Sequence, residues 1–209
     1  MSQVVLYDFW RSSAAYRVRI ALGLKGVAYT RVPVDIAAGE QFEAGFAALN
    51  SQKLVPALAI DGLLLTQSLA IIDYLDAKHK APPMVSSDPA SRSRTLAQAL
   101  IIAADIHPIN NLRVLKYLRG ELGQDEDAVS TWYHHWIAEG FTALEAQAPA
   151  DGLFGGALPN LADVCLVPQM ANARRFDTPL DAYPKLVRID AALQAIPAFA
   201  AAAPEAVKS

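Results

Sequence analysis

The hydrophobic and polar positions of the first 80 or so residues follow two alternating patterns. Short apolar runs are typical of strands, and longer stretches with apolar residues three and four apart are typical of helices. The strand-like runs are residues 4–9, 28–35, 56–60 and 63–67, and the helical patterns cover residues 14–26, 39–50 and 67–79. Asp61 and Gly62 separate the last two strands, which is a strong hairpin signal. This order predicts an α/β domain in which a hairpin completes a sheet begun by parallel strands.

A segment with three prolines, residues 80–92, interrupts this pattern and predicts a linker. No strand is expected beyond it, and helical patterns cover residues 91–123, 125–147, 160–176 and 184–196. We therefore expect an α/β domain at residues 1–81, a linker at 82–88 and an all-α domain at 89–209. The first of these patterns predicts one long helix with Pro108 as the site of a kink, and the alanine-rich tail, residues 198–209, is expected to fray.

The composition is that of a globular chain long enough to bury a core: of 209 residues, 53% are hydrophobic and 19% are charged. The formal charge of −3 gives no sign of a nucleic-acid partner. No apolar run approaches a membrane span, and the N-terminus lacks the pattern of a signal peptide. Cys165 is the only cysteine, which excludes an internal disulfide and favours a cytoplasmic location. His134 and His135 are adjacent and would lie on different helix faces, so we expect no metal site.

Ser12 and Ser13 stand between the first strand and the first helix, in the stretch FWRSSAAYRVRI. Serine is a common helix cap, and that role alone explains both residues. A helix N-terminus also offers free N–H groups and a partial positive charge, which stabilise an anion such as a thiolate, and a serine hydroxyl can donate to its sulfur. Because the chain has no cysteine at this turn, such a thiolate would arrive on a ligand. The local sequence leaves both interpretations open.

Two further features of the first half are weak individually. Pro56 comes just before a strand, where it is either an ordinary edge residue or follows a cis bond that exposes the backbone of Val55 to an extended peptide. Gln67 and Ser68 open a helix, where they would serve as a cap or bind a carboxylate.

Polar residues stand among apolar neighbours at two places in the second half. His107, Asn110 and Asn111 are spaced i, i+3 and i+4, which would put them on one helix face as a buried polar network or as the lining of a pocket. Arg174 and Arg175 end a helix, where an arginine either compensates the helix dipole or receives a carboxylate.

Together, the serine turn, the Val-Pro pair before the hairpin, the Gln-Ser pair at the third helix and the all-α second half resemble the glutathione transferases. Four stretches are similar to the zeta class in particular: RSSAAYRVRIALGLKG, FAALNSQKLVPAL, QSLAIIDYL and LADVCLVPQMANARRF. The stretch DIHPINN is similar to the bacterial maleylpyruvate isomerases of that class. The resemblance covers essentially the whole chain. It implies an α/β thioredoxin-like N-terminal domain that binds glutathione and an all-α C-terminal domain that forms most of the electrophile pocket.

The resemblance also implies a role for each matching residue. Ser12 and Ser13 would act catalytically by meeting the glutathione sulfur, with Arg17 supporting their turn. The other implied glutathione contacts are Gln41, the Val55 backbone, Gln67, Ser68, His107, Asn111 and Arg113. The implied contacts of a small dianionic substrate are Arg11, His107, Asn110, Arg113 and Arg175, of which Arg175 would also be catalytic. Asn160 and Asp163 would form the family's capping box, a role in folding. A homodimer is implied as well.

The activity implied is glutathione-dependent cis–trans isomerisation of maleylacetoacetate or maleylpyruvate, with glutathione as coenzyme. DIHPINN favours maleylpyruvate, whereas Leu112 stands where some maleylpyruvate enzymes carry a basic residue, so both substrates stay open. Ala14 and Tyr16 replace the Cys and Trp usual in the class, which argues against chemistry that needs an enzyme thiol but leaves isomerisation intact. The alternatives are conjugation of glutathione to small electrophiles and a glutathione-binding module without catalysis.

Overall fold

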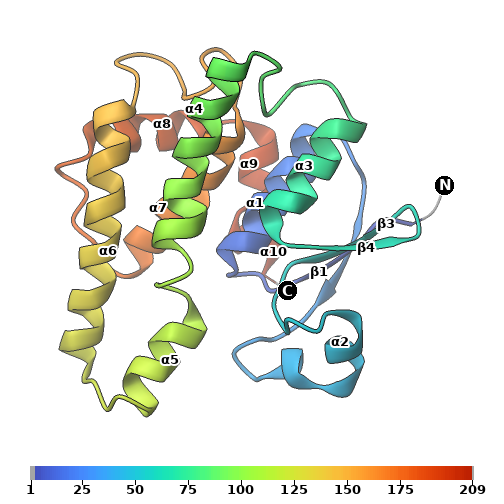
Figure 1. Ribbon diagram of the computed structural model, residues 1–209, viewed down its shortest axis with the longest axis vertical. Helices are drawn as coiled ribbons and strands as arrows, with labels where there is room; N and C mark the ends of the chain where they lie inside the picture. The colour runs from blue at the N-terminus through green and yellow to red at the C-terminus, as the bar shows by residue number, and fades with distance from the viewer. Residues whose placement is uncertain (1–2, 209) are drawn as a thin grey trace. The chain divides into compact units, whose positions relative to one another are not determined.

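The computed structural model describes residues 3–208, and the chain divides into two compact units (Figure 1). The α/β unit comprises the described residues up to Pro83 together with those from Ala195 onward, and the helical unit runs from Met84 to Gln194. The boundary after Pro83 falls inside the expected linker. The C-terminal segment, however, groups with the α/β unit, whereas the sequence pattern assigned it to the helical domain.

The sheet of the α/β unit has its strands in the order β2-β1-β3-β4. Their bounds are Val5–Asp8 (β1), Thr30–Pro33 (β2), Ala57–Ile60 (β3) and Leu63–Thr66 (β4). β1 pairs with β2 in parallel, and β3 is antiparallel to both of its neighbours. Asp61 and Gly62 join β3 to β4 with φ of 54° and 77°, the left-handed backbone that a two-residue hairpin loop needs. The predicted sheet and hairpin are confirmed.

Two helices of this unit begin at candidate serines, and a third lies between them in the sequence. Their bounds are Ser13–Leu24 (α1), Ala44–Leu49 (α2, after a 3₁₀ turn at Glu40–Phe42) and Ser68–Lys78 (α3). α1 ends near Gly26, which adopts φ of 63° just beyond the last turn. α1 and α3 pack against each other, and Ile20 and Ile71 are fully buried. This packing fixes the N-termini of both helices.

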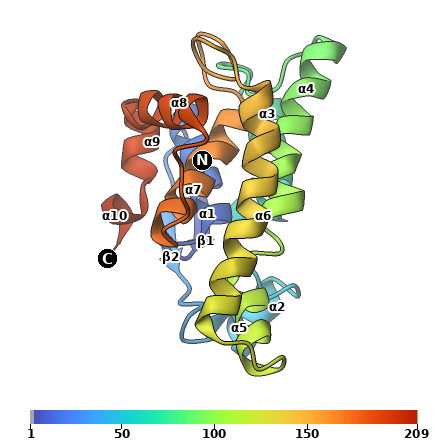
Figure 2. The ribbon, with the colours of Figure 1, turned by 90° about the vertical axis from the view of Figure 1, so that its left-hand side faces the viewer.

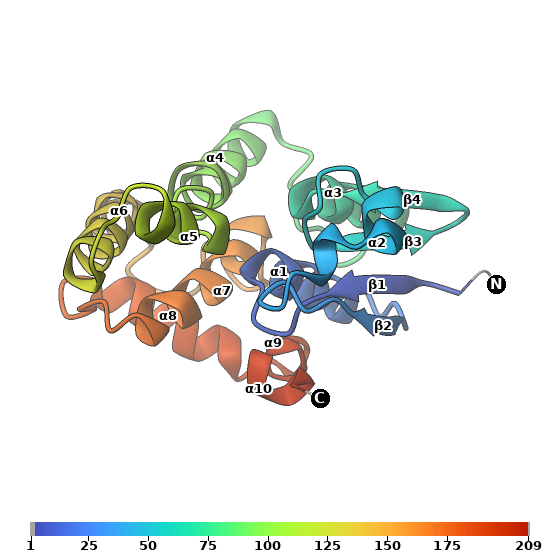
Figure 3. The ribbon, with the colours of Figure 1, turned by 90° about the horizontal axis from the view of Figure 1, so that it is seen from below.

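The C-terminal segment forms two short helices, α9 (Pro197–Ala202) and α10 (Pro204–Val207). α9 packs against α1, as Figure 3 shows. Their approach is close, because a Cβ added to Gly23 would lie 3.2 Å from the Cβ of Ala198. For residues 198–208 the expected fraying is therefore wrong: Phe199 and Ala202 are buried and anchor the alanine-rich segment in the core. Ser209 lies outside the described residues.

The helical unit begins with a helix that is broken, contrary to the single helix expected over residues 91–123. α4 covers Pro89–Leu100, a π-helical turn covers Ile101–Ile106, and α5 covers Leu112–Gly120. Pro108 has no N–H with which to continue the helix, and Asn111 starts a new one as the N-cap of α5. Residues 107–111 consequently form a non-helical connection.

Three more helices complete this unit as predicted: α6 (Glu126–Gln147), α7 (Leu161–Arg175) and α8 (Pro184–Gln194). α6 is the long helix in Figure 2, and α5 lies beside its N-terminal end. α7 is buried along most of its length, Cys165 included, and packs against α4 and α8. Among residues 3–208 no helix is both long and apolar enough to cross a membrane.

α7 begins with the predicted capping box. The Oδ1 of Asn160 accepts from the N–H groups of Ala162 and Asp163 at 2.8 and 3.2 Å, and the Oδ2 of Asp163 accepts from the N–H of Asn160 at 2.9 Å. Asp163 also accepts from the N–H groups of Phe154 and Gly155. Burial nevertheless raises the pKa of its carboxyl to about 6. Asn therefore replaces the usual Ser or Thr at this helix start without loss of the motif.

Candidate functional site

Ser12 orders the turn that precedes α1. Its Oγ accepts a hydrogen bond from the N–H of Ala15 at 3.2 Å, which makes it the N-cap of the helix, and its own N–H donates to the carbonyl of Phe9 at 2.8 Å. A serine hydroxyl has one hydrogen to donate besides the lone pairs that accept. Because the cap uses only a lone pair, Ser12 can cap the helix and donate to an anion at the same time. The two interpretations of this serine are compatible.

Arg17 joins the N-terminal ends of two helices. It is 1% exposed, and its Nη1 donates to the Oγ of Ser68 at 3.4 Å. Ser68 is the first residue of α3, and Ser13, 6% exposed, is the first residue of α1. Two helix N-termini and a buried cation create a positive potential that favours negatively charged groups.

The other predicted contacts in this unit are held in different ways. Gln67 precedes α3 with φ of 66°, an unusual backbone for a residue other than glycine, and its exposed side chain donates to Gln52 at 3.0 Å. Strained positions of this kind cluster at ligand-binding sites. Gln41 is 8% exposed, and its Oε1 has no hydrogen-bond partner among the described residues. Val55 is half-buried and precedes a cis bond to Pro56.

These groups fit glutathione by their chemistry. Glutathione is a tripeptide with carboxylates, amide N–H groups and a thiol. The helix starts at Ser12 and Ser68 offer N–H groups and hydroxyls to anions, and the buried oxygen of Gln41 is an acceptor suited to a ligand N–H. The α/β unit thus holds donors for negative groups and an acceptor for an amide.

The structure does not give His107, Asn110 and Asn111 the common helix face expected from their spacing. Residues at this spacing share a face only on a continuous helix, and residues 107–111 form a non-helical connection instead. Asn111 caps α5, since its Oδ1 accepts from two backbone N–H groups of the first turn at 3.1 and 3.2 Å. His107 is half-buried. Their contacts with glutathione stay predictions, and Asn111 would have to make its contact in addition to capping.

The connection at residues 107–111 is fastened to α6 at two points. Asn110 is 6% exposed, and its Nδ2 donates to the carbonyl of Tyr133 at 3.2 Å. The Nε1 of Trp132 donates to the carbonyl of Ile109 at 3.0 Å. Within the part of the chain that the structure describes, the Oδ1 of Asn110 has no hydrogen-bond partner. In the buried side chain of Asn110 the amide nitrogen therefore has a hydrogen-bond partner, and the amide oxygen has none within residues 3–208. The bonded nitrogen agrees with the predicted buried polar network, and the oxygen could accept a hydrogen bond from a ligand.

Arg175 lies at the end of α7 beside an aromatic pair. Its guanidinium carbon is 4.8 Å from the centre of the Phe176 ring, and that ring stacks on Tyr133 with centroids 3.9 Å apart. Burial raises the pKa of the Tyr133 hydroxyl, and the charge of Arg175 opposes the rise. The side chain of Arg175 is exposed and lies over an aromatic ring, and its planar guanidinium suits it to bind a carboxylate.

The other candidate arginines are held differently. Arg174 pairs with the buried carboxylate of Asp190 at 2.6 Å, so the structural role considered for this pair of arginines belongs to Arg174. Arg11 is exposed, with its guanidinium carbon 4.9 Å from the centre of the Trp10 ring. Arg113 is exposed in the first turn of α5. Arg174 is exposed as well, and its ion pair with the buried Asp190 is what distinguishes it from Arg11 and Arg113.

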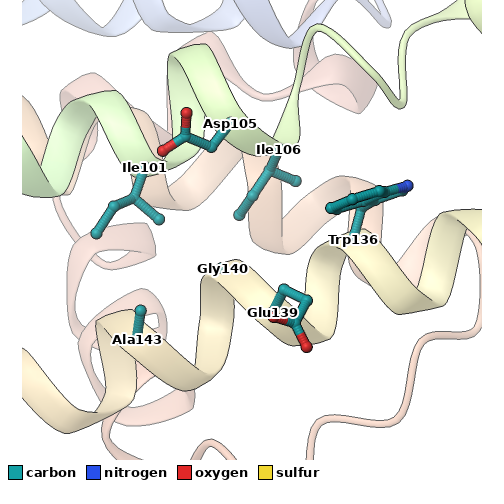
Figure 4. Close-up of a pocket in the computed structure, with 7 residues that line it drawn as sticks. All are labelled: Ile101, Asp105, Ile106, Trp136, Glu139, Gly140 and Ala143. Atoms are coloured by element: carbon teal, nitrogen blue, oxygen red, sulfur yellow. The ribbon is translucent and has the colours of Figure 1, made fainter.

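The helical unit also has a pocket of about 230 Å³ between the π-helical turn and α6 (Figure 4). Its lining is Ile101, Asp105, Ile106, Trp136, Glu139, Gly140 and Ala143. Gly140 permits a close approach there, since an added Cβ would lie 2.3 Å from the Cδ1 of Ile106. The lining contains none of the predicted site residues. Its charged groups, Asp105 and Glu139, would repel a dianion, so we do not assign the expected substrate to this pocket.

Tyr133 and Phe176, which hold Arg175, were not predicted as site residues. They belong to different helical segments, and a ring contact between residues far apart in the sequence leaves no periodic signal. The aromatic stretch TWYHHW around Tyr133 was the only available hint. Across residues 3–208, no group of three or more His, Cys, Asp and Glu side chains is placed to hold a metal ion.

Comparison with known proteins gives matches over both units. The family model of the glutathione S-transferase N-terminal domain matches residues 2–77. A probable maleylacetoacetate isomerase of Vibrio cholerae is 49% identical, over 98% of this chain and 97% of the relative. The maleylpyruvate isomerase of a Ralstonia species is 45% identical, over 96% of this chain and 97% of the relative.

Solved structures extend the similarity to the fold. The holo structure of a maleylpyruvate isomerase, a bacterial glutathione S-transferase of the zeta class, has a TM-score of 0.95 at 44% identity, over 98% of this chain and 99% of that one. A maleylacetoacetate isomerase from Anaeromyxobacter dehalogenans, solved with dicarboxyethyl glutathione and citrate in the active site, has a TM-score of 0.87 at 40% identity, over 99% and 97%. The similarity therefore includes the helical unit as well as the α/β unit.

Proposed function

Since the chain belongs to the zeta class of glutathione S-transferases, we propose that it is a glutathione-dependent cis–trans isomerase of a maleyl diketo acid. The substrate is maleylacetoacetate or maleylpyruvate, and the product is the fumaryl isomer, in the breakdown of aromatic compounds. The observation that carries the proposal is the serine-capped start of α1, with a buried cation nearby that contacts the start of α3. Such a turn stabilises a thiolate that the chain itself does not supply there.

The residues of the α/β unit hold glutathione in this proposal. Bound glutathione supplies a thiolate that adds reversibly to the cis double bond, which then becomes a single bond and can rotate. Ser12 and Ser13 hold the sulfur and donate to its charged form. The peptide part and the γ-glutamyl carboxylate are held by Gln41, the Val55 backbone, Gln67 and Ser68. Arg17 keeps the two helix starts together through its contact with Ser68.

Most of the groups proposed to meet the substrate belong to the helical unit, and Arg11 belongs to the α/β unit. Arg175 binds a carboxylate bidentately and stabilises the negative charge that develops when the double bond opens. Arg11 and Arg113 are further cations for the dianion, and His107 and Asn110 line the substrate. The relative from Anaeromyxobacter dehalogenans holds dicarboxyethyl glutathione and citrate in its active site, which supports the proposal that this chain binds a ligand with several carboxylates.

The test is an assay of both maleyl compounds with and without glutathione. We expect conversion to the trans isomer only with glutathione, at a constant glutathione concentration. Glutathione consumed in proportion to product would indicate a conjugating transferase, and glutathione binding without conversion would indicate a binding module. Isomerisation by protein stripped of all thiols would contradict the mechanism.

The proposal includes a homodimer, which the family resemblance implies. Light scattering at micromolar concentration should give twice the mass of one chain, and a monomer mass would contradict it. The proposal also includes a cytoplasmic location, because glutathione is kept in its thiol form there.

A further inference from the structure

The C-terminal segment accepts hydrogen bonds from three side chains elsewhere in the α/β unit. The donors and carbonyl acceptors are Tyr16 to Phe199 at 3.3 Å, Arg19 to Ala202 at 2.9 Å and Arg31 to Val207 at 2.5 Å. Carbonyls at the end of a helix lack N–H partners within that helix. Side chains of α1 and β2 therefore provide the donors that hold α9 and α10 in place.

Arg19 connects this segment to the serine turn. It is 1% exposed, and each of its three nitrogens donates to a different partner. Nη1 donates to the Oδ2 of Asp8 at 2.7 Å, Nε to the carbonyl of Ala202 at 2.9 Å and Nη2 to the carbonyl of Trp10 at 3.0 Å. Trp10 lies two residues before Ser12, inside the turn that Ser12 closes. A planar guanidinium engaged on all three nitrogens cannot rotate without breaking these bonds.

The side chain of Trp10 also contacts the C-terminal segment. The Nζ of Lys208 lies 5.0 Å from the centre of the indole ring, within the range of a cation–π interaction. Both the backbone and the ring of Trp10 are thus held by groups that are part of the segment or bonded to it.

We propose that Arg19 and the C-terminal segment position the serine turn. The segment holds the guanidinium, and the guanidinium holds the carbonyl of Trp10, which sets the place of Ser12 and Ser13 at the start of α1. One consequence, the stabilisation of a glutathione thiolate by the serines, rests on the proposed function. Arg19 is a positioning residue, because it acts through the turn and not by contact with a ligand.

The test variant is Arg19→Lys, which keeps the positive charge near Asp8 but replaces the three-armed fork by one ammonium. In the ligand-free variant, amide hydrogen exchange at Ser12 and Ala15 should be roughly tenfold faster than in the wild type. With glutathione bound, titration of the thiolate absorbance should give a thiol pKa higher by about half a unit, because the hydroxyls are less well placed.

The matched control is Arg31→Lys. Arg31 also pairs with Asp8, at 2.9 Å, and donates to the carbonyl of Val207. Within residues 3–208 none of its hydrogen bonds goes to the serine turn. Because Tyr16 and Arg19 still hold the segment, this variant should lower the melting temperature while exchange at Ser12 and the thiol pKa stay close to the wild-type values. If the two variants behave alike in both readouts, Arg19 is a structural residue and the proposal is overturned.

A full-length surface variant, Lys208→Ala, keeps the proposal testable if Arg19→Lys does not fold. It removes the cation next to Trp10 and should increase exchange at Ser12 by a smaller factor, about twofold to threefold. If hydrogen exchange at Ser12 is unchanged in this variant, Lys208 does not help to position the serine turn. If, in addition, no Arg19 variant folds, that result overturns the proposed role of the C-terminal segment. Hydrogen exchange is measured without glutathione, so it tests the position of the serine turn even if the wild type binds no glutathione. Absence of glutathione binding would refute the proposed function and leave this test unaffected.

Discussion

The candidate serines of the α/β unit and the candidate arginines of the helical unit are held in opposite ways. The serines are short hydroxyl side chains at the starts of α1 and α3, where Ser13 and Ser68 are buried and Ser12 caps its helix. In the helical unit Arg113 and Arg175 are exposed long side chains. The first set owes its position to the backbone, and the second carries charge on stems that can adapt.

This difference predicts how folding and binding respond to substitution. A residue that starts a helix contributes to stability as well as to ligand binding, so both should change together in the α/β unit. An exposed arginine contributes little to stability, so binding should change alone in the helical unit.

Arg175→Ala should cause the largest loss of activity. If Arg175 binds a substrate carboxylate, its removal should cost about 2–5 kcal/mol of transition-state stabilisation. This loss corresponds to a kcat/KM that is roughly thirtyfold to several thousandfold lower. The affinity for glutathione and the melting temperature should hardly change. Arg175→Lys should recover little, because an ammonium cannot reproduce the planar fork. Steady-state kinetics beside a thermal melt measures both quantities.

Arg174→Ala is the control for this experiment. Arg174 pairs with the buried Asp190, so its loss should lower the melting temperature and leave kcat/KM near the wild-type value. Normal kinetics and a lowered melting temperature in Arg175→Ala would instead make Arg175 a second structural arginine.

Asp163 belongs to the capping box of α7, a helix start in the helical unit with a role in folding. The pKa of its carboxyl is raised to about 6 by burial, above the ordinary value of 3.8. The folded state therefore binds the proton more tightly than the unfolded chain. The Asp163 carboxyl therefore contributes about 1–3 kcal/mol to the free energy of unfolding. This contribution is fully present below about pH 4 and is lost as the pH rises through about 6.

The measurement is urea unfolding between pH 4 and 7 for the wild type and for Asp163→Asn, which does not titrate. The free energy of unfolding of the wild type minus that of the variant should fall over this range. A difference that rises with pH would mean that the three backbone N–H donors outweigh burial.

Ser12→Ala should change stability and thiolate binding together. Loss of the cap should cost about 1 kcal/mol of stability, and loss of a hydroxyl that donates to sulfur should cost about 1–3 kcal/mol of thiolate stabilisation. Titration of the thiolate absorbance should therefore give a raised pKa for bound glutathione. Asp125→Ala is a matched control, since Asp125 caps α6 and lies in the other unit.

Ser13→Ala identifies which serine meets the sulfur, because Ser13 is not the cap. If neither serine variant shifts the thiol pKa beyond the Asp125 control, both serines have only structural roles.

The features that the sequence predicted correctly depend on contacts between near neighbours. The Asp61-Gly62 hairpin, the end of α1 and the capping box of α7 each involve residues within a few positions of one another. The sequence predicted a kink at Pro108 but not the full break at residues 107–111, because apolar spacing continued across Pro108 while the side chain of Asn111 started a new helix.

The contacts that the sequence did not predict join distant segments. The tail was expected to fray because its composition is low in large apolar residues, but the buried ring of Phe199 and the arginine donors hold it. In the same way, the ring of Phe176 beneath Arg175 stacks on Tyr133 of α6, a contact between distant segments. Periodicity reports which face of an element is buried, and it does not report which distant side chain meets that face.

Arg113→Ala should have the smallest effect, and it bears most directly on the contrast between the two units. Arg113 is exposed in the first turn of α5, so its attraction to a dianion is screened by water. Its loss should weaken substrate binding by about 0.2–1 kcal/mol, up to fivefold in KM at low salt. At about 1 M salt, where the Debye length is about 3 Å, the effect should vanish. Arg119→Ala is the control on the same helix, because Glu126 already neutralises Arg119 through bonds of 2.6 and 2.7 Å. A loss beyond tenfold that persists at high salt would make Arg113 a direct, fixed contact. The helical unit would then also hold a binding group in a set position, and adaptable charge would no longer distinguish it from the α/β unit.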